Sequence, residues 1–322
     1  MPSADEINLE DMIEEEDVVI TLTHFGYIKR MPEGTYRPQK RGGKGIIALT
    51  TREEDFVEDL FITSTHDTLL FITNKGKVYS LKAYEIPDAG RQAKGTAIIN
   101  LLNLTSDEKV SAIIPIKEFN PDNYLAFVTK QGIIKKTSLE RFTNIRKNGI
   151  IAINLREDDE LISVKMTDGN RELILVTRKG LAIRFKEDDV REMGRGATGV
   201  KAITLNKNDI VVATELVEKD KYLLVISEKG FGKRTSLDEY KTQNRGGKGL
   251  LTYNIKDKTG DIVSAKVIYE NDEIMMISQR GTIIRLNTND ISIMGRNTQG
   301  VTLMRTEDDD KVVAVAKYVG ED

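Results

Sequence analysis

Residues 18–30 read Val18-Val19-Ile20-Thr21-Leu22-Thr23-His24-Phe25-Gly26-Tyr27-Ile28-Lys29-Arg30. A run rich in β-branched residues ends in Thr, a three-residue turn ends in Gly, and a second short run carries two cations. β-branched residues favour strands, and a Gly-containing loop of this length favours a hairpin. The stretch therefore predicts a β-hairpin with Lys29 and Arg30 on its second strand.

The same pattern occurs six times. The turn glycines are separated by 50, 56, 48, 50 and 51 residues and are Gly26, Gly76, Gly132, Gly180, Gly230 and Gly281. A second glycine follows each of them after 17 or 19 residues, at Gly45, Gly95, Gly149, Gly199, Gly249 and Gly300. A further strand, an acidic turn and another β-rich run complete each repeat, so a repeat offers about four strands. Four strands in about fifty residues are typical of a propeller blade.

We therefore predict an all-β chain in which six blades close into a ring. The expected blades cover 17–65, 66–119, 120–168, 169–218, 219–270 and 271–320. Together they form one domain over 17–322, preceded by an acidic leader or linker over 1–16, which we expect to be solvated.

Composition excludes several classes of function. The chain of 322 residues has no Cys and only two His, so thiolate metal sites and disulfides are excluded and a reducing cytoplasm fits. No apolar run approaches the length that spans a bilayer, so no membrane partner is expected. His24 and His66 lie far apart in the sequence without a set of ligands, which favours structural or surface roles.

The charge is unevenly distributed. The six windows from each hairpin turn to its closing glycine carry net charges between +2 and +5, whereas the whole chain carries −3. The remaining turns and the leader must therefore be acidic. This segregation predicts a ring with a basic rim despite a sequence pI of about 5.7.

One rim segment concentrates this charge. It reads Gln39-Lys40-Arg41-Gly42-Gly43-Lys44-Gly45, and residues 243–249 repeat it as Gln-Asn-Arg-Gly-Gly-Lys-Gly. Glycines let the backbone turn sharply or approach another surface, and Lys and Arg beside backbone N–H groups suit phosphate oxygens. A solvated hairpin loop is the alternative for a single copy, but the repetition favours phosphate binding.

Other cations recur at corresponding positions of the repeats, which favours a curved track of phosphate-binding groups. Exposed strands also carry Lys or Arg to discourage aggregation, and this is the structural alternative. The candidate rim residues are Lys29, Arg30, Lys77, Lys94, Lys135, Lys136, Arg146, Lys147, Arg184, Arg195, Lys233, Arg234, Arg245, Lys248, Arg285 and Arg296.

No catalytic motif is visible in the sequence. There is no phosphate-binding Gly-x-x-x-x-Gly-Lys-Ser/Thr loop and no Gly-x-Ser-x-Gly elbow. Acidic turns such as 158–159 and 308–310 are expected to hold solvated carboxylates. No base-reading helix or stacking platform is evident either, so binding to the backbone of duplex DNA, independent of sequence, is the predicted activity.

The sequence resembles a known family of domains. Residues 39–45 resemble the box Gln-Arg-Arg-Gly-Gly-Lys/Arg-Gly of the C-terminal domain of bacterial DNA gyrase A, with Lys40 in place of the usual Arg. Residues 18–30 and Tyr36 look like the opening of that domain, and its six repeats cover the whole chain.

The resemblance implies a six-bladed β-pinwheel, in which blades exchange strands, with duplex DNA wrapped around its perimeter in a positive sense. It implies a domain without its own catalytic site or cofactor, since ATP and Mg²⁺ act elsewhere in the topoisomerase. The implied partners are DNA, the N-terminal region of gyrase A itself and gyrase B in an A2B2 complex. The isolated domain is expected to be monomeric.

Three alternatives remain at this stage. A domain of the topoisomerase IV type would bend DNA without chiral wrapping. A propeller scaffold would bind protein partners instead of DNA. An enzymatic propeller would need a convergent set of catalytic residues, which the sequence does not show.

Overall fold

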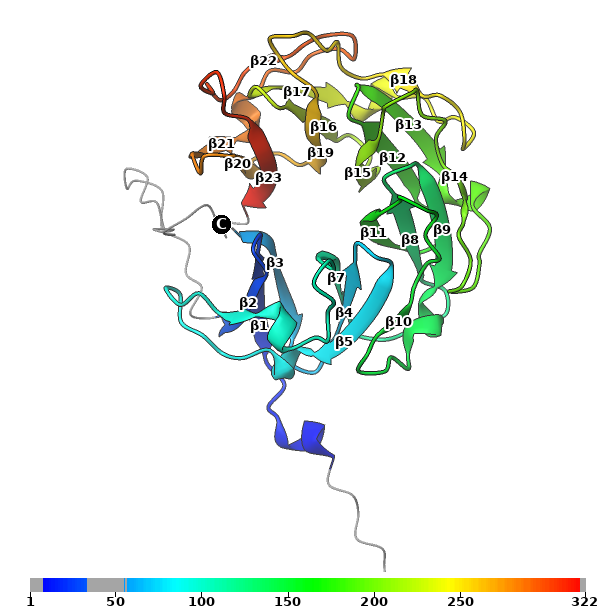
Figure 1. The fold of residues 1–322 in the computed structure, drawn as a ribbon, viewed down its shortest axis with the longest axis vertical. Helices are drawn as coiled ribbons and strands as arrows, with labels where there is room; N and C mark the ends of the chain where they lie inside the picture. The colour runs from blue at the N-terminus through cyan, green and yellow to red at the C-terminus, as the bar shows by residue number, and fades with distance from the viewer. Residues whose placement is uncertain (1–7, 34–54, 56, 319–322) are drawn as a thin grey trace, which may run out of the picture.

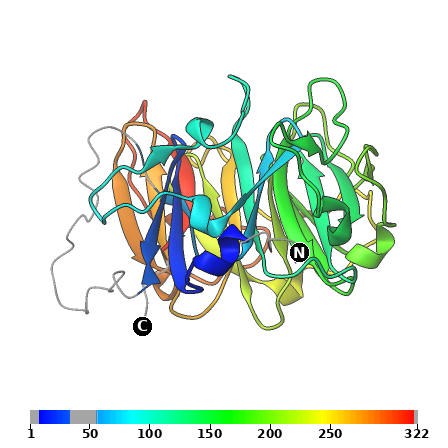
Figure 2. The same ribbon diagram turned by 90° about the horizontal axis from the view of Figure 1, so that it is seen from below.

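The computed structural model describes residues 8–33, 55 and 57–318, which form six antiparallel sheets arranged in a ring (Figure 1). Viewed from the side, the sheets stand next to one another across the thickness of the ring (Figure 2). The predicted all-β architecture with six blades is confirmed. The strand β23 of the last blade contacts β3 of the first.

Each of the first five sheets contains four strands, three long and one of two residues. The first is ordered β3-β1-β2-β6 and comprises β1 (Asp17–Thr23), β2 (Tyr27–Pro32), β3 (Val57–Ser64) and β6 (Thr96–Ala97). The second is ordered β10-β5-β4-β7 and comprises β4 (Thr68–Thr73), β5 (Lys77–Lys82), β7 (Val110–Ile116) and β10 (Ile150–Ile151).

The remaining sheets follow the same plan. The third comprises β8 (Tyr124–Thr129), β9 (Ile133–Ser138), β11 (Leu161–Thr167) and β14 (Val200–Lys201). The fourth comprises β12 (Glu172–Thr177), β13 (Leu181–Lys186), β15 (Val211–Leu216) and β18 (Leu250–Leu251). The fifth comprises β16 (Tyr222–Ser227), β17 (Phe231–Ser236), β19 (Ile262–Ile268) and β22 (Val301–Thr302). In the described part of the chain the sixth has three strands, β20 (Glu273–Ser278), β21 (Ile283–Asn287) and β23 (Val312–Tyr318).

The short outermost strand of each four-stranded sheet comes from the next repeat. Thus β14, which lies in the fourth repeat, pairs with β9 of the third, with Val200 opposite Ile134. Likewise β18 pairs with β13, with Leu250 opposite Ala182. This exchange of strands is what the resemblance implied, and it places the segments preceding the exchanged strands on the perimeter of the ring (Figure 1).

The blades are held together by apolar cores between neighbouring sheets. On β12, Leu173 and Leu175 face the core shared with the third blade, whereas Ile174 and Val176 face the core shared with the fifth. Alternate residues of a strand point to opposite faces, so a strand buried on both faces must be apolar throughout. This explains the uninterrupted apolar runs of the repeats.

Short 3₁₀ turns complete the blades. They are η1 (Leu9–Met12), η3 (Ala83–Glu85), η4 (Ile98–Asn100), η5 (Leu139–Phe142), η6 (Glu187–Asp189), η7 (Leu237–Glu239) and η8 (Thr288–Asp290). The η1 turn lies in the acidic leader, and residues 13 and 14 of the leader contact residues 65 and 66. His66 Nε2 lies 2.8 Å from the Ile13 carbonyl oxygen, and Thr65 Oγ1 donates to the Glu14 carbonyl oxygen at 2.7 Å.

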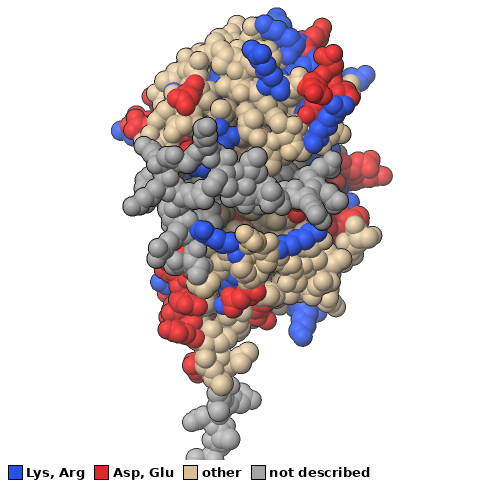
Figure 3. Space-filling view, turned by 90° about the vertical axis from the view of Figure 1, so that its left-hand side faces the viewer, with Lys and Arg blue, Asp and Glu red and all other residues tan. Residues whose placement is uncertain are grey.

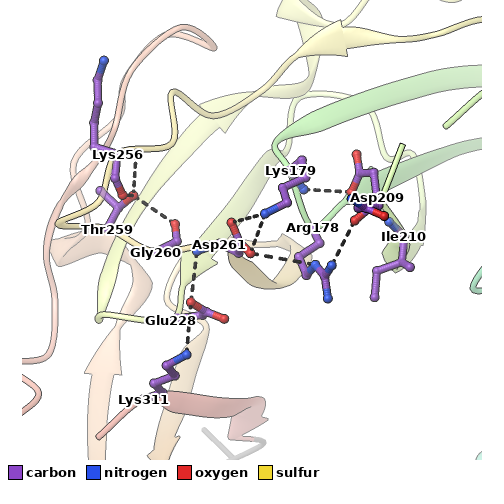
Figure 4. Close-up of polar contacts among 11 residues, drawn as sticks. Arg178, Lys179, Asp209, Ile210, Glu228, Lys256, Thr259, Gly260, Asp261 and Lys311 are labelled. Atoms are coloured by element: carbon purple, nitrogen blue, oxygen red, sulfur yellow. Dashed lines mark hydrogen bonds and ion pairs between the residues drawn. The ribbon is translucent and has the colours of Figure 1, made fainter. Parts of the chain in front are cut away.

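The acidic turns have a structural role that the sequence did not predict. Asp209 is buried, and its Oδ1 accepts hydrogen bonds from the backbone N–H groups of Lys179 and Ile210 at 3.0 and 2.8 Å (Figure 4). Asp159 and Asp310 occupy the same position in their own blades. The expectation of solvated carboxylates at these two residues is therefore wrong, because each one fixes a hairpin turn by satisfying its buried donors.

The exchange depends on glycine where backbones come close together. Gly199 has a φ of +102°, and a Cβ placed there would lie 2.4 Å from the Ile134 carbonyl oxygen. Gly249 repeats this arrangement, with a φ of +79° and the Ala182 carbonyl oxygen at 2.5 Å. Only a residue without a Cβ combines this conformation with this approach. In the second to sixth repeats, the second periodic glycine thus marks the entry into the exchanged strand.

Candidate nucleic-acid interface

The strongest sequence motif, residues 39–45, lies outside the described residues, but its near copy at 243–249 is described. This copy crosses the outer edge of the fourth blade, where the Gln243 N–H donates to the Arg184 carbonyl oxygen at 2.7 Å. Arg245 donates from its guanidinium to the Lys201 carbonyl oxygen at 2.6 Å. Lys248 is exposed to solvent.

Within residues 57–318, five equivalent loops precede the exchanged strands, and we call them the exchange loops. Each has six residues and ends in the second periodic glycine of its repeat. They are residues 90–95, 144–149, 194–199, 244–249 and 295–300. Because the strands that follow them are the outermost strands of the sheets, the exchange loops lie along the perimeter.

Three predicted rim cations lie beneath exchange loops, and two of them are fully buried. Lys135 is 0% exposed, and its ammonium group donates to the carbonyl oxygens of Ala152, Gly194 and Arg195. Lys233, also 0% exposed, donates to carbonyl oxygens of the loop 295–300. Such an ammonium supplies the donors that a tight loop needs for its inward-facing carbonyl groups.

Lys29 is arranged in the same way but is partly exposed. Its ammonium donates to three carbonyl oxygens of the loop 90–95, at 2.8 to 3.1 Å. Burial lowers the pKa of all three groups, to about 7 for Lys135 and about 8 for Lys233. The positive charge of Arg195 lowers the pKa of Lys135 further, whereas at Lys233 the carboxylate of Glu239 raises the pKa and the charge of Arg296 lowers it.

A second set of predicted cations joins neighbouring blades. The residue after each of these lysines, or its equivalent, donates to backbone carbonyl groups at the 3₁₀ turn of the next blade. The contacts are Arg30 to Ile86 at 2.9 Å, Lys136 to Glu187 at 3.3 Å, Arg184 to Leu237 at 3.1 Å and Arg234 to Ile291 at 2.7 Å. These side chains therefore bind protein carbonyl groups and connect neighbouring blades.

The remaining predicted strand cations have local partners. Arg285 pairs with Glu273 on the neighbouring strand. Lys77 lies over the ring of Tyr79, with its ammonium nitrogen 5.5 Å from the ring centre. Lys94, on an exchange loop, lies 4.0 Å from the centre of the Tyr27 ring.

Arginines of three exchange loops connect each loop to the strand exchanged one repeat earlier. The guanidinium groups of Arg195, Arg245 and Arg296 donate to carbonyl oxygens of residues 151, 201 and 251, at 3.1, 2.6 and 2.9 Å. These hydrogen bonds connect consecutive exchange loops along the perimeter. Each guanidinium has five N–H donors, so donors remain for another acceptor.

Three of the exposed predicted cations, Arg146, Lys147 and Lys248, lie on exchange loops. All three are exposed, and no hydrogen bond or ion pair holds their side chains within the described part of the chain. On the side of the ring drawn in Figure 3, by contrast, Lys and Arg side chains lie next to Asp and Glu side chains. The visible charge on that side is mixed instead of uniformly basic.

The sequence reasoning missed Arg91. It is exposed on the loop 90–95 and precedes the closing glycine by four residues, as Arg195, Arg245 and Arg296 do. The spacing to the second periodic glycine was the signal that would have identified it.

The described residues offer no group of three or more His, Cys, Asp or Glu side chains that could hold a metal ion. Nδ1 of His24 lies 2.5 Å from Glu58 Oε1, an acidic neighbour that the sequence did not indicate. Among these residues, no helix is long and apolar enough to cross a membrane.

Comparison with known families gives a match over all six repeats. The family described as "DNA gyrase C-terminal domain, beta-propeller" matches residues 17–64, 67–117, 123–168, 171–218, 221–268 and 272–317. The DNA gyrase A protein of Halalkalibacterium halodurans is 62% identical over 320 residues, covering 99% of this chain and 38% of that protein. The DNA gyrase A protein of Clostridium acetobutylicum is 57% identical over 317 residues, covering 98% of this chain and 38% of that protein. The chain thus spans about two fifths of the length of these relatives.

Two solved structures resemble the whole ring. One is a DNA gyrase A C-terminal domain, with a TM-score of 0.75 and 31% identity, covering 94% of this chain and 100% of that one. The other is the C-terminal domain of a DNA topoisomerase IV, with a TM-score of 0.82 and 30% identity, covering 95% of this chain and 94% of that one.

Proposed function

This chain belongs to the family of DNA gyrase C-terminal domains, and from that premise we propose that it binds duplex DNA along its perimeter and wraps it in a positive sense. The observation that supports this most is the series of exchange loops, which present Arg and Lys side chains at successive blade junctions. Lys and Arg bind phosphate oxygens whatever the base sequence, so binding is independent of sequence.

The wrap serves ATP-dependent negative supercoiling by presenting a neighbouring DNA segment to the cleavage site of the enzyme. ATP, Mg²⁺ and the catalytic residues act elsewhere in the topoisomerase, and this domain needs no cofactor. Its partners are the N-terminal region of gyrase A and the gyrase B protein in an A2B2 complex in the bacterial cytoplasm. The isolated domain is a monomer.

Bending sets the energetic requirement. Curving a site of ~20–30 base pairs by 40–90° costs about 1–6 kcal/mol. Phosphate neutralisation along the perimeter offsets this cost, and each neutralised phosphate steepens the dependence of binding on salt. Affinity therefore falls steeply as the salt concentration rises.

The box at 39–45 keeps the bound DNA in its wrapped path, whereas the exchange loops supply general affinity for DNA. Replacing Lys40, Arg41 and Lys44 together by Ala tests this division. We expect the variant to lose the shift in plasmid linking number while it retains most of its affinity in gel retardation. Equal loss of wrapping and binding would contradict the division, and the matched control is Arg245→Ala with Lys248→Ala in the second copy of the motif.

A second candidate is planar bending without chiral wrapping, the behaviour expected of a domain of the topoisomerase IV type. The TM-score of 0.82 with that domain is the observation in its favour. Binding without any change in linking number would support it. A failure to bind DNA at any salt concentration would instead favour a scaffold for protein partners.

A further inference from the structure

The exchange loops are of two kinds, distinguished by the side chain beneath them. Lys29, Lys135 and Lys233 occupy equivalent positions in their blades. Each comes directly after the residue that pairs with the first residue of the exchanged strand. In the second and fourth blades the same position holds Tyr79 and Ile183. Loops 90–95, 194–199 and 295–300 therefore lie on a lysine, whereas loops 144–149 and 244–249 lie on an aromatic or aliphatic side chain.

The contacts beneath the second kind are apolar. A Cβ added to Gly149 would lie 2.9 Å from the Tyr79 ring, and one added to Gly247 would lie 3.7 Å from Ile183 Cδ1. Neither loop receives an ammonium group from below. In the loop 244–249 the Gly246 carbonyl instead accepts from Thr204 Oγ1 at 2.7 Å.

The loops that lack a lysine beneath them carry one themselves. Lys147 and Lys248 are exposed and have no hydrogen bond or ion pair to the described residues. Loops 194–199 and 295–300 contain no Lys, and the guanidinium of the one Arg in each donates to a backbone carbonyl group. Loop 90–95 combines both features, since Lys29 lies beneath it and Lys94 stacks on Tyr27.

The two positions of the lysine have different chemical consequences. An ammonium group has three donors, and Lys135 and Lys233 use theirs on carbonyl oxygens inside the protein. The ammonium groups of Lys147 and Lys248 keep all their donors for an external acceptor. The acceptor matched to such a group at a glycine-containing loop is a phosphate oxygen.

We propose that the perimeter binds phosphate groups of DNA through lysine ammonium groups at alternating blade junctions. Loops 144–149 and 244–249 supply the ammonium groups that bind phosphate. Loops 194–199 and 295–300 have a structural role, and Lys135 and Lys233 fix their conformation. This inference rests on the proposed function, because the phosphate groups that Lys147 and Lys248 bind belong to the backbone of the bound duplex. It adds that neighbouring junctions contribute unequally to affinity.

The first test removes the same amount of charge from each kind of loop. One variant carries Lys147→Ala and Lys248→Ala, and the matched variant carries Arg195→Gln and Arg296→Gln. Retardation of a linear duplex is measured between 50 and 200 mM salt, after circular dichroism has shown that both variants are folded. Each lost phosphate contact reduces the slope of log K against log salt by ~0.9.

We expect the lysine pair to reduce the slope by about 1.8 and the affinity at 0.1 M salt by roughly 50-fold. We expect the arginine pair to change the slope by less than about half that amount. Equal losses, or a larger loss from the arginine pair, would overturn the alternation. Absence of salt-dependent binding by the unaltered chain would instead overturn the proposed function, so the two failures are distinguishable.

A second measurement needs no variant and holds even if the arginine pair unfolds. The unaltered chain is acetylated at lysine with and without saturating duplex, and each site is quantified by mass spectrometry. Lys147 and Lys248 should react in the free chain and be protected by DNA, whereas Lys135 and Lys233 should stay unreactive in both states. Equal acetylation of Lys147 and Lys248 with and without bound DNA would contradict the proposal.

Discussion

The buried lysines make the stability of the ring depend on pH in a predictable direction. Burial lowers the pKa of Lys135 to about 7 and that of Lys233 to about 8 in the folded chain, from the ordinary value of 10.5 that applies when the chain is unfolded. Between these values the unfolded state binds more protons, so raising the pH favours the folded state. Stability should therefore rise, not fall, as the solution becomes mildly alkaline.

The size of the effect follows from the two pKa values. One pKa unit corresponds to ~1.4 kcal/mol of free energy. Between pH 7 and pH 9, Lys135 contributes about 2 kcal/mol of added stability, and Lys233, which titrates one unit later, contributes about 1 kcal/mol. The expected increase in the free energy of unfolding is therefore about 3 kcal/mol.

The assay is urea unfolding followed by far-ultraviolet circular dichroism at pH 7, 8 and 9. The unaltered chain should show a rising urea midpoint, and Lys135→Met with Lys233→Met should abolish most of the rise, whatever its effect at pH 7. Lys147→Met is the matched control, because this exposed lysine should leave the rise intact. A flat profile for the unaltered chain, or a full rise in the double variant, would refute the reasoning.

Two further predictions concern how the blades are joined. Gly199→Ala should lower the free energy of unfolding by more than about 1 kcal/mol, since its Cβ would meet the Ile134 carbonyl oxygen, whereas Gly196→Ala, with no atom within 4 Å, should be nearly neutral in thermal melts. Arg234→Met should cost about 1–3 kcal/mol, because it removes donors from two carbonyl groups of the sixth blade. Arg280→Met, which breaks only exposed ion pairs, should cost less than about 1 kcal/mol. A larger loss of unfolding free energy in Arg280→Met than in Arg234→Met would contradict the role of Arg234 in connecting the blades.

The ring could be predicted from the sequence because its signals are local. The hairpin turns and β-rich runs recur at a nearly fixed period, and each repeat is long enough for one blade. The strand exchange has no such local signal. It depends on the close approach of Gly199 to Ile134 and of Gly249 to Ala182, pairs more than sixty residues apart in the sequence.

The candidate site could be predicted only in part, for a related reason. The repeat pattern assigned the cations to strands and loops, but it could not separate those that face solvent from those that face protein. The acceptors of Lys135 and Lys233 are backbone carbonyl groups of residues 194–195 and 295–298, which no side-chain pattern reveals. Asp209 was hidden in the same way, because it accepts from backbone N–H groups.

We propose above all that the perimeter of this chain wraps duplex DNA in a positive sense. The most direct test is to reseal nicked plasmid with ligase in the presence of increasing amounts of this chain at low salt, and then to measure the linking number. We expect a positive shift in linking number that grows with the amount of bound chain and vanishes as the salt concentration is raised. An unchanged linking number, with binding confirmed by gel retardation, would contradict it.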